Sequence, residues 1–182
     1  VVFGRHPEVA RAVWSRDVGF PGDGRYLDFH RDATGELSDE AVQPHLLPTG
    51  SRVPLRLRYH RVTDRHLPAS AKQPYEPEAA EAATAEHAEQ FLAGLSEQLE
   101  AQGARLGWSA LAVAPFDAEL FGHWWREGPR FIDALARRTA GRLTWTTPTR
   151  ELEREEPVEL LEPAPGTWGA GADFSVWVAP ET

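Results

Sequence analysis

The sequence contains neither cysteine nor methionine in its 182 residues. The absence of cysteine excludes disulfide bonds, thiolate nucleophiles and cysteine metal sites, so any active site must use carboxylate and imidazole groups. Because the chain starts at Val1 and has no methionine at all, we expect either a truncated protein or modified methionines. The first alternative makes the chain an interior piece of a longer protein.

Long apolar runs and an excess of positive charge are also missing. No segment is long enough to cross a bilayer and no signal peptide opens the chain, so a cytoplasmic protein without a membrane partner is expected. The formal net charge of -9 argues against a nucleic-acid partner, because phosphate binding needs clustered Lys and Arg. The hydrophobic share of 41% is that of an ordinary globular domain.

Three segments have the apolar periodicity of helices, namely 7–14, 78–102 and one that begins at Pro129. Gly103 predicts the end of the second helix. On the third helix, three apolar side chains are expected to face the interior: Phe131, Ile132 and Leu135. The acidic stretch 151–156 predicts a solvated helix face.

Three further segments have the pattern of strands. Residues 53–59 alternate apolar and mostly basic side chains, which predicts a half-exposed strand. Residues 109–115 form a nearly continuous apolar run, typical of a strand buried in a parallel sheet, and 143–146 reads as the next strand. Helices and strands in this order predict an α/β fold. Residues 32–50 are expected to form an irregular insertion.

Asp117 directly follows the apolar run 109–115, which is where catalytic groups lie in parallel α/β barrels. The surrounding loop, 114–128, combines this acid with His123 and two adjacent indoles. Two interpretations fit the loop. It carries a catalytic carboxylate, or it is an aromatic plug that closes one end of a barrel, with Asp117 as a helix cap.

The residues 116–128, Phe-Asp-Ala-Glu-Leu-Phe-Gly-His-Trp-Trp-Arg-Glu-Gly, resemble the fourth signature motif of glycoside hydrolase family 57, specifically of its α-1,4-glucan branching enzymes. Residues 167–172, with Trp177 nine positions after Trp168, resemble the fifth motif, where the family has a sugar-stacking Trp. Residues 2–23 resemble the stretch that follows the nucleophile motif of the family. The resemblance therefore runs along the whole chain.

This resemblance implies a fold and a domain organisation. Residues 1–160 are expected to form the C-terminal part of an incomplete (β/α)7 barrel, with the insertion around 32–50. Residues 161–182 are expected to be a substrate-binding segment rich in Trp and Gly, leading to a helical domain that is missing here. The motif that holds the Glu nucleophile of the family is also missing, so the chain alone is expected to be inactive.

The resemblance further implies a retaining transglycosylase that cleaves α-1,4 bonds and forms α-1,6 bonds, as in glycogen or α-glucan biosynthesis, without metal or cofactor. Asp117 matches the general acid/base. Such a group needs a raised pKa, which three neighbouring aromatic rings are expected to provide by excluding water: Phe121, Trp124 and Trp125.

The expected partner is an α-1,4-glucan such as amylose or a glycogen-like chain. The candidate substrate-binding residues are Arg5, Trp14, Gly22, His123, Trp168 and Trp177. An indole can stack on the apolar face of a sugar ring, although buried core indoles are the alternative for the three tryptophans. His87 is expected to be a packed or hydrogen-bonded core histidine, with a ligand role as the alternative.

Other functions remain open at this point. The missing nucleophile favours a non-catalytic glucan-binding fragment or subunit, and another α-glucan hydrolase of family 57 fits the same motifs. A metal-dependent carbohydrate deacetylase is also built on an incomplete barrel with Asp and His ligands. His123 has no second histidine at ligand spacing nearby, which disfavours this last reading.

Overall fold

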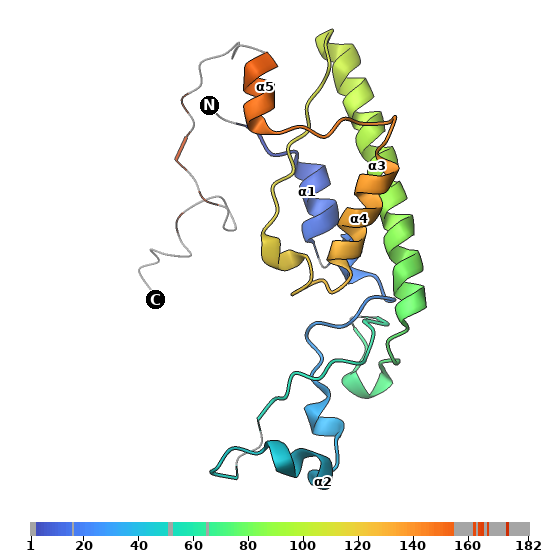
Figure 1. Cartoon of the computed structure of the whole chain (residues 1–182), viewed down its shortest axis with the longest axis vertical. Helices are drawn as coiled ribbons and strands as arrows, with labels where there is room; N and C mark the ends of the chain where they lie inside the picture. Colours follow the sequence, from blue (N-terminus) through green and yellow to red (C-terminus); the bar gives the residue numbers. More distant parts are fainter. Residues whose placement is uncertain are drawn as a thin grey trace. The chain divides into compact units, whose positions relative to one another are not determined.

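A computed structural model describes residues 3–15, 17–50, 53–64, 66–154 and the isolated positions 162, 164, 165, 167 and 174 (Figure 1). The chain divides into two compact units, one of residues 2–145 and one made mainly of 146–182. In the latter, helix α5 covers Pro148–Arg154 and none of its residues is buried. The solvated helix expected at 151–156 is therefore confirmed up to residue 154. The boundary predicted at residue 160 lies outside the described residues and stays a prediction.

Helix α1 spans Pro7–Trp14, as its periodicity predicted. The backbone N–H of Val9 donates to Nδ1 of His6 at 3.4 Å, so His6 caps the helix. Pro7 suits the first turn, where its missing N–H has no helical partner to lose. One face of α1 is buried through Val9, Ala10 and Val13. The last residue, Trp14, is left 47% exposed.

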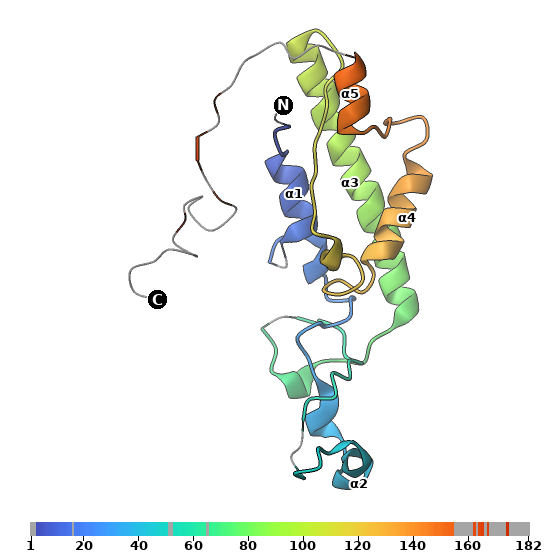
Figure 2. The ribbon, with the colours of Figure 1, turned by 60° about the vertical axis from the view of Figure 1, so that its left-hand side comes forward.

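Two longer helices form most of the remaining scaffold. Helix α3 spans Pro77–Leu106 and helix α4 spans Gly128–Arg138, and the two pack side by side (Figures 1 and 2). Both were predicted, but the predicted end of α3 at Gly103 is wrong. The helix continues to Gly107, whose φ of +79° provides the left-handed conformation that terminates helices. Gly103 instead accepts the capping hydrogen bond from the N–H of Gly107 at 2.9 Å.

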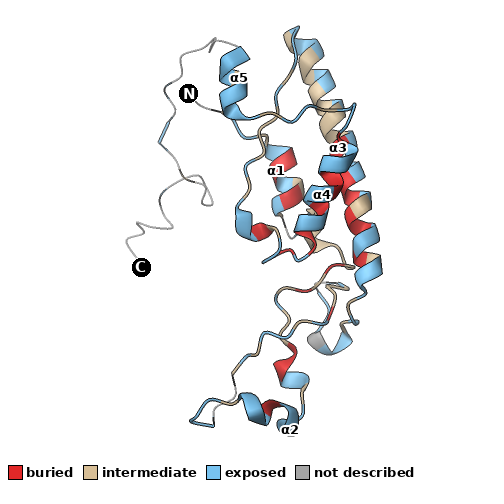
Figure 3. Ribbon diagram, in the orientation of Figure 1, coloured by how far each residue is buried: buried red, intermediate tan, exposed pale blue. Residues whose placement is uncertain are grey.

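The hydrophobic core lies where the inner faces of α1, α3 and α4 meet, as the buried residues in Figure 3 show. Its largest fully buried side chains include Trp125, Tyr26, Phe131, Leu92 and Val13. Phe131 and Leu135 face inward as predicted, whereas Ile132 is 42% exposed. One residue corresponds to about 100° of rotation around a helix, so Ile132 cannot share the inward direction of Phe131.

No strand is present among the described residues, and this part of the chain is mostly helical. The prediction of sheet strands at 109–115 and 143–146 is therefore wrong for this structure. Residues 109–115 make one isolated parallel bridge, between Arg5 and Val113, in which the N–H of His6 donates to Val113 at 2.8 Å. A buried parallel strand needs hydrogen-bonded neighbours on both sides, and here Leu111 is 46% exposed.

The segment 53–59 is not the predicted strand either. Arg56 has a φ of +56°, which interrupts the pleat and reverses the alternation of faces beyond it. As a result Leu57 and Tyr59 are exposed, whereas His60 is buried. Two isolated antiparallel bridges follow, Leu27 with Arg61 and His60 with Pro74.

The predicted irregular insertion at 32–50 consists largely of short helical turns. They are the 3-10 helix Ala33–Glu36, the α-helix α2 at Asp39–Val42 and the 3-10 helix Gln43–His45. Asp32 and Ser38 cap the first two through their side chains. Elsewhere, 3-10 helices cover Phe20–Gly22, Ala69–Ala71 and Ala118–Leu120.

Candidate functional site

A half-open cavity of about 780 Å³ lies within the unit 2–145. Its apolar walls come from Trp14, Pro21, Leu27, Phe29, Val62, Leu67, Leu120 and Trp124. Its polar walls come from Ser15, Asp28, His30, Arg31 and Lys72, and the backbone of Gly22 completes the lining. This volume is in the range of sites that bind small organic ligands.

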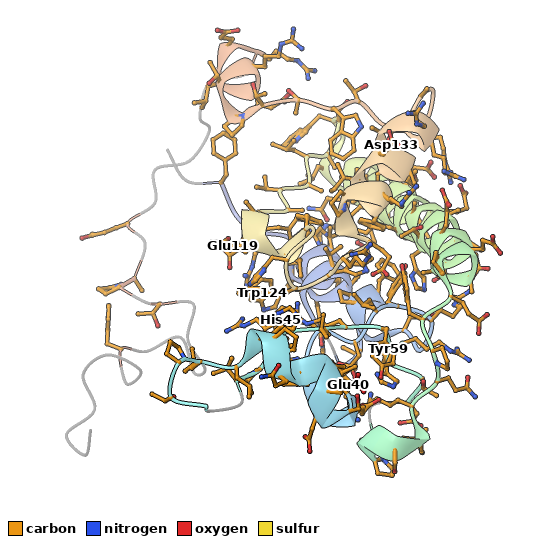
Figure 4. The ribbon with its side chains drawn as sticks, turned by 60° about the horizontal axis from the view of Figure 1, so that its bottom comes forward. Glu40, His45, Tyr59, Glu119, Trp124 and Asp133 are labelled. Carbon is orange, nitrogen blue, oxygen red and sulfur yellow. The ribbon has the colours of Figure 1, made fainter. Side chains whose placement is uncertain are left out.

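Two half-exposed indoles form the aromatic side of this cavity. Trp14 ends helix α1, and Trp124 belongs to the loop that carries Asp117. Their ring centroids are 5.8 Å apart with an interplanar angle of 67°, an edge-to-face contact. Figure 4 shows Trp124 and Glu119 beside the short turn that follows Asp117. The indole N–H and exposed ring faces of such a pair suit a ligand with both apolar and hydroxyl groups.

The polar side of the cavity is built around an ion pair between Asp28 and Lys72. The Oδ2 atom of Asp28 lies 2.5 Å from Nζ of Lys72, and both side chains are only 10% exposed. Lys72 also donates to the carbonyl of Val62 at 2.9 Å, and Oδ1 of Asp28 accepts from the N–H of His30 at 2.9 Å. Sequence reasoning missed both residues. The only available signal was that Lys72 is the single lysine of the chain.

Gly22 lines the cavity as part of a tightly bonded turn. The adjacent Asp23 accepts two hydrogen bonds from the guanidinium of Arg25, at 2.9 Å each, and one from the backbone N–H of Arg25 at 2.8 Å. Burial of Asp23 works to raise its pKa, but the bonds from Arg25 outweigh this effect and hold the pKa below its ordinary value. Arg25 in turn donates to Glu86 of helix α3 at 2.8 Å.

His87, a buried residue of helix α3, contacts the same turn. Its Nδ1 atom lies 2.7 Å from the hydroxyl of Tyr26, its Nε2 atom lies 3.5 Å from Asp23, and Phe20 stacks on its ring at 4.6 Å. Burial lowers the pKa of His87, and burial also raises the pKa of Tyr26. The prediction of a hydrogen-bonded core histidine is confirmed.

Asp117 occupies the cap position of the 3-10 helix Ala118–Leu120, but its side chain makes no cap hydrogen bond. It is exposed and does not line the cavity, whereas Leu120 and Trp124 of the same loop do. The expectation that aromatic rings shield Asp117 from water is wrong for this structure. Trp125 packs instead into the core, with ring centroids 5.3 Å from Tyr26 and 5.0 Å from Phe131.

Three residues of the motif 116–128 shape the loop. Gly122 has a φ of +105°, which strains any other residue, and a Cβ on Gly128 would lie 2.8 Å from Cα of Phe121. Buried Glu127 accepts a hydrogen bond from the N–H of Leu27, a cavity residue, at 3.3 Å. Burial and a hydrogen bond to Glu127 raise the pKa of Tyr75 to about 12. Glu127 thereby fixes the motif loop against the segment that carries Asp28.

Two further candidate residues, Arg5 and His123, do not line the cavity. His123 is exposed and packs edge-on against Phe29 with ring centroids 5.4 Å apart. Arg5 is exposed beside its bridge to Val113. Trp168 and Trp177 fall outside the described residues. Of the predicted substrate-binding residues, the structure thus brings Trp14 and Gly22 together and does not bring Arg5 and His123 to the same wall.

The described ranges hold neither a long apolar helix nor a cluster of metal-binding side chains. Among helices in those ranges, none combines the length and the apolarity needed to span a membrane. The same residues include no cluster of three or more His, Asp or Glu side chains with the arrangement of a metal site.

Two proteins that are similar in sequence to this chain are named as branching enzymes. A probable 1,4-alpha-glucan branching enzyme of Mycobacterium tuberculosis (strain CDC 1551 / Oshkosh) is 36% identical over 181 residues, covering 97% of this chain and 30% of its own length. The 1,4-alpha-glucan branching enzyme of Thermococcus kodakarensis is 32% identical over 186 residues, covering 100% of this chain and 24% of its own length. The chain thus spans less than a third of these relatives. No protein-family model matches it.

The similar solved structures include both an alpha-amylase and branching enzymes. The alpha-amylase AmyC of Thermotoga maritima matches with a TM-score of 0.82 and 37% identity, over 93% of this chain and 33% of the other. A GH57-type branching enzyme of Pyrococcus horikoshii matches with a TM-score of 0.78 and 32% identity, over 99% of this chain and 30% of the other. Over nearly its whole length the chain is therefore similar to a segment of GH57-type branching enzymes.

Proposed function

We propose that the chain is part of a 1,4-alpha-glucan branching enzyme, in which it carries the general acid/base and part of the glucan-binding surface. One observation carries this proposal. The loop 116–128, which holds Asp117, also supplies Leu120 and Trp124 to a cavity of ligand size whose other walls are aromatic and ionic. The relatives' names, which specify α-1,4-glucan as substrate, support the same activity.

In the proposed reaction, Asp117 protonates the oxygen of an α-1,4 bond as it leaves, and then removes the proton from the 6-hydroxyl of an acceptor chain. A Glu nucleophile outside this chain forms the glycosyl ester in the first step, as the α-1,4 bond breaks, and the acceptor oxygen displaces this Glu from the sugar in the second step. Such a retaining pair needs its carboxyl groups roughly 5 to 5.5 Å apart. The segment 109–115 would then be a strand of the incomplete (β/α)7 barrel, with neighbours from the rest of the enzyme covering Leu111 and shielding Asp117.

The remaining residues bind the glucan in this proposal. Trp14, Trp168 and Trp177 provide surfaces for sugar rings, while Arg5, Gly22 and His123 contact hydroxyl groups. The substrates are amylose or glycogen-like chains, the process is glycogen or α-glucan biosynthesis, and the location is the cytoplasm. The proposed chemistry uses only carboxyl groups and needs no cofactor.

A second candidate function is hydrolysis of α-1,4 bonds, which the similarity to an alpha-amylase favours. Branching keeps the number of reducing ends constant and creates α-1,6 bonds, whereas hydrolysis of α-1,4 bonds increases the number of reducing ends and creates no α-1,6 bonds. The two are separated by incubating amylose with the protein expressed from the natural reading frame of this chain. We expect new chains after debranching with isoamylase and few new reducing ends before it. New reducing ends without branch points would replace the branching proposal by hydrolysis, and binding without either would favour a glucan-binding subunit.

A further inference from the structure

The ion pair of Asp28 and Lys72 is costly for a wall that is otherwise largely apolar. Removing two charges from water carries a penalty that a single ion pair often fails to recover, and apolar residues of similar size commonly stabilise a protein as well or better. Both side chains are 10% exposed and line the same cavity as the apolar Val62 and Leu67. The chain has one lysine, and it is placed here. Folding stability alone therefore does not explain why an ion pair is buried in this wall.

Two residues that line the cavity, Lys72 and Arg31, have hydrogen-bond donors without an acceptor among the described residues. A lysine ammonium group has three donors, of which Lys72 uses one for Asp28 at 2.5 Å and one for the carbonyl of Val62 at 2.9 Å. Within the described ranges nothing accepts from the third donor. The Nε–H of Arg31, another lining residue, is buried and has no partner among the same residues. Buried donors of this kind normally have a partner, which can be a ligand.

The charges of the wall also constrain the kind of ligand. Asp28 and Lys72 neutralise each other, and Arg31 is paired with Glu36. A charged ligand such as a phosphate would have to compete with Asp28 for Lys72. A neutral ligand with several hydroxyl groups can instead accept from Lys72 and donate to Asp28 without breaking the pair. Trp14 and Trp124, which line the same cavity, suit the apolar face of a sugar ring.

We propose that Asp28 and Lys72 form a hydroxyl-binding subsite that holds one glucosyl unit of the glucan chain in this cavity, against Trp14 and Trp124. This inference rests on the proposed glucan-binding function and assigns two residues that the family motifs do not include. The pair acts as a preformed clamp, because the hydrogen bonds from His30 to Asp28 and from Lys72 to Val62 fix both side chains before the sugar arrives.

The experiment uses maltoheptaose as the probe and follows two signals. Tryptophan fluorescence reports on all seven tryptophans of the chain, and the part that Trp14→Ala and Trp124→Ala remove is assigned to these two rings. The ¹³Cε signal of labelled lysine reports on Lys72, identified as the signal that Lys72→Arg lacks. We expect both signals to titrate with the same Kd. Lys72→Met and Asp28→Asn should each weaken binding about tenfold, the size of one hydrogen bond to a charged group. Arg130→Met removes an exposed ion pair between α3 and α4, and should bind like the wild type.

Each outcome bears on one of the two claims. If the wild-type protein does not bind maltoheptaose, the proposed function fails. If it binds and quenches tryptophan fluorescence, while the Lys72 signal stays fixed and both variants bind normally, the clamp is wrong and the glucan-binding function stands. If a variant fails to fold by circular dichroism, the ¹³Cε titration of the wild type decides alone. Glucose 1-phosphate moving the Lys72 signal in preference to maltoheptaose would also overturn the clamp, in favour of an anion site.

Discussion

Trp14 and Trp124 lie edge to face with their ring centroids 5.8 Å apart, although one ends helix α1 and the other belongs to the loop after Asp117. Each keeps more than two fifths of its surface exposed, at 47% and 41%. Contact between two large aromatic rings usually serves to bury them. This pair stays half-exposed and lines a cavity, which is the arrangement expected of a ligand platform.

This relationship predicts separate effects on binding and on stability. Trp14→Ala and Trp124→Ala should each weaken maltoheptaose binding by about tenfold, because each removes an aromatic surface from the ligand. The free energy of unfolding should fall by only about 1 to 2 kcal/mol, less than for a fully buried Trp, since both side chains are half-exposed. Calorimetric titration and urea unfolding measure the two quantities.

Trp108→Ala is the matched control, because Trp108 is 57% exposed and does not line the cavity. It should leave the affinity for maltoheptaose unchanged. Equal losses of affinity in all three variants would contradict the platform.

His87 predicts a dependence of stability on pH. Burial lowers its pKa from the ordinary value of 6.5, and the charged groups that face it are Asp23, Arg25 and Glu86. Below pH 6.5 the unfolded chain binds a proton at this position more readily than the folded chain. The stability due to neutral His87 is therefore fully present above pH 6.5 and is lost as the pH falls toward the lowered pKa.

Unfolding in urea between pH 5 and pH 8 measures this effect, and His87→Gln is the comparison variant. Glutamine keeps a polar hydrogen-bonding group at this position but does not titrate. As the pH falls, the unfolding free energy of the wild type should decrease more than that of His87→Gln. A pH-independent difference would show that His87 does not titrate differently in the folded chain.

Two glycines predict opposite responses to the same substitution. Gly128→Ala places a Cβ 2.8 Å from the Cα of Phe121, so the motif loop must shift, at a cost of about 1 to 3 kcal/mol. Gly94 lies inside helix α3 with nothing within 4 Å of its added Cβ, so Gly94→Ala should stabilise the chain by about 0.5 to 1 kcal/mol. Urea unfolding of both variants tests the packing of the motif loop, and stabilisation by Gly128→Ala would refute it.

The features that the sequence predicts correctly are mainly local. Pro7 and the apolar spacing after it define helix α1, and the same logic finds α3 and α4. The end of α3 was misplaced because two glycines stand close together, and only the backbone shows that Gly107 is the one with a positive φ. Local patterns therefore predict helices well and their ends less well.

The errors concern features that depend on distant residues. An apolar run such as 109–115 becomes a sheet strand only beside suitable neighbours, and the described residues supply a single bridge. At Arg56, a positive φ reverses the faces of 53–59 without the glycine that would predict it. Asp28 and Lys72 meet through the fold, and no spacing rule links them. By contrast, the motif around Asp117 could be recognised from the sequence, because all of its residues are contiguous.

The central claim is that Asp117 is the general acid/base of a branching enzyme. The most direct test compares Asp117→Asn with Glu119→Gln in the protein expressed from the natural reading frame, counting α-1,6 branch points formed on amylose. Both residues are exposed carboxylates of the same loop, so each substitution removes one negative charge from it. We predict that Asp117→Asn lowers the branching rate by at least about a hundredfold while maltoheptaose binding persists, and that Glu119→Gln leaves the rate nearly unchanged. Normal branching by Asp117→Asn would contradict the assignment.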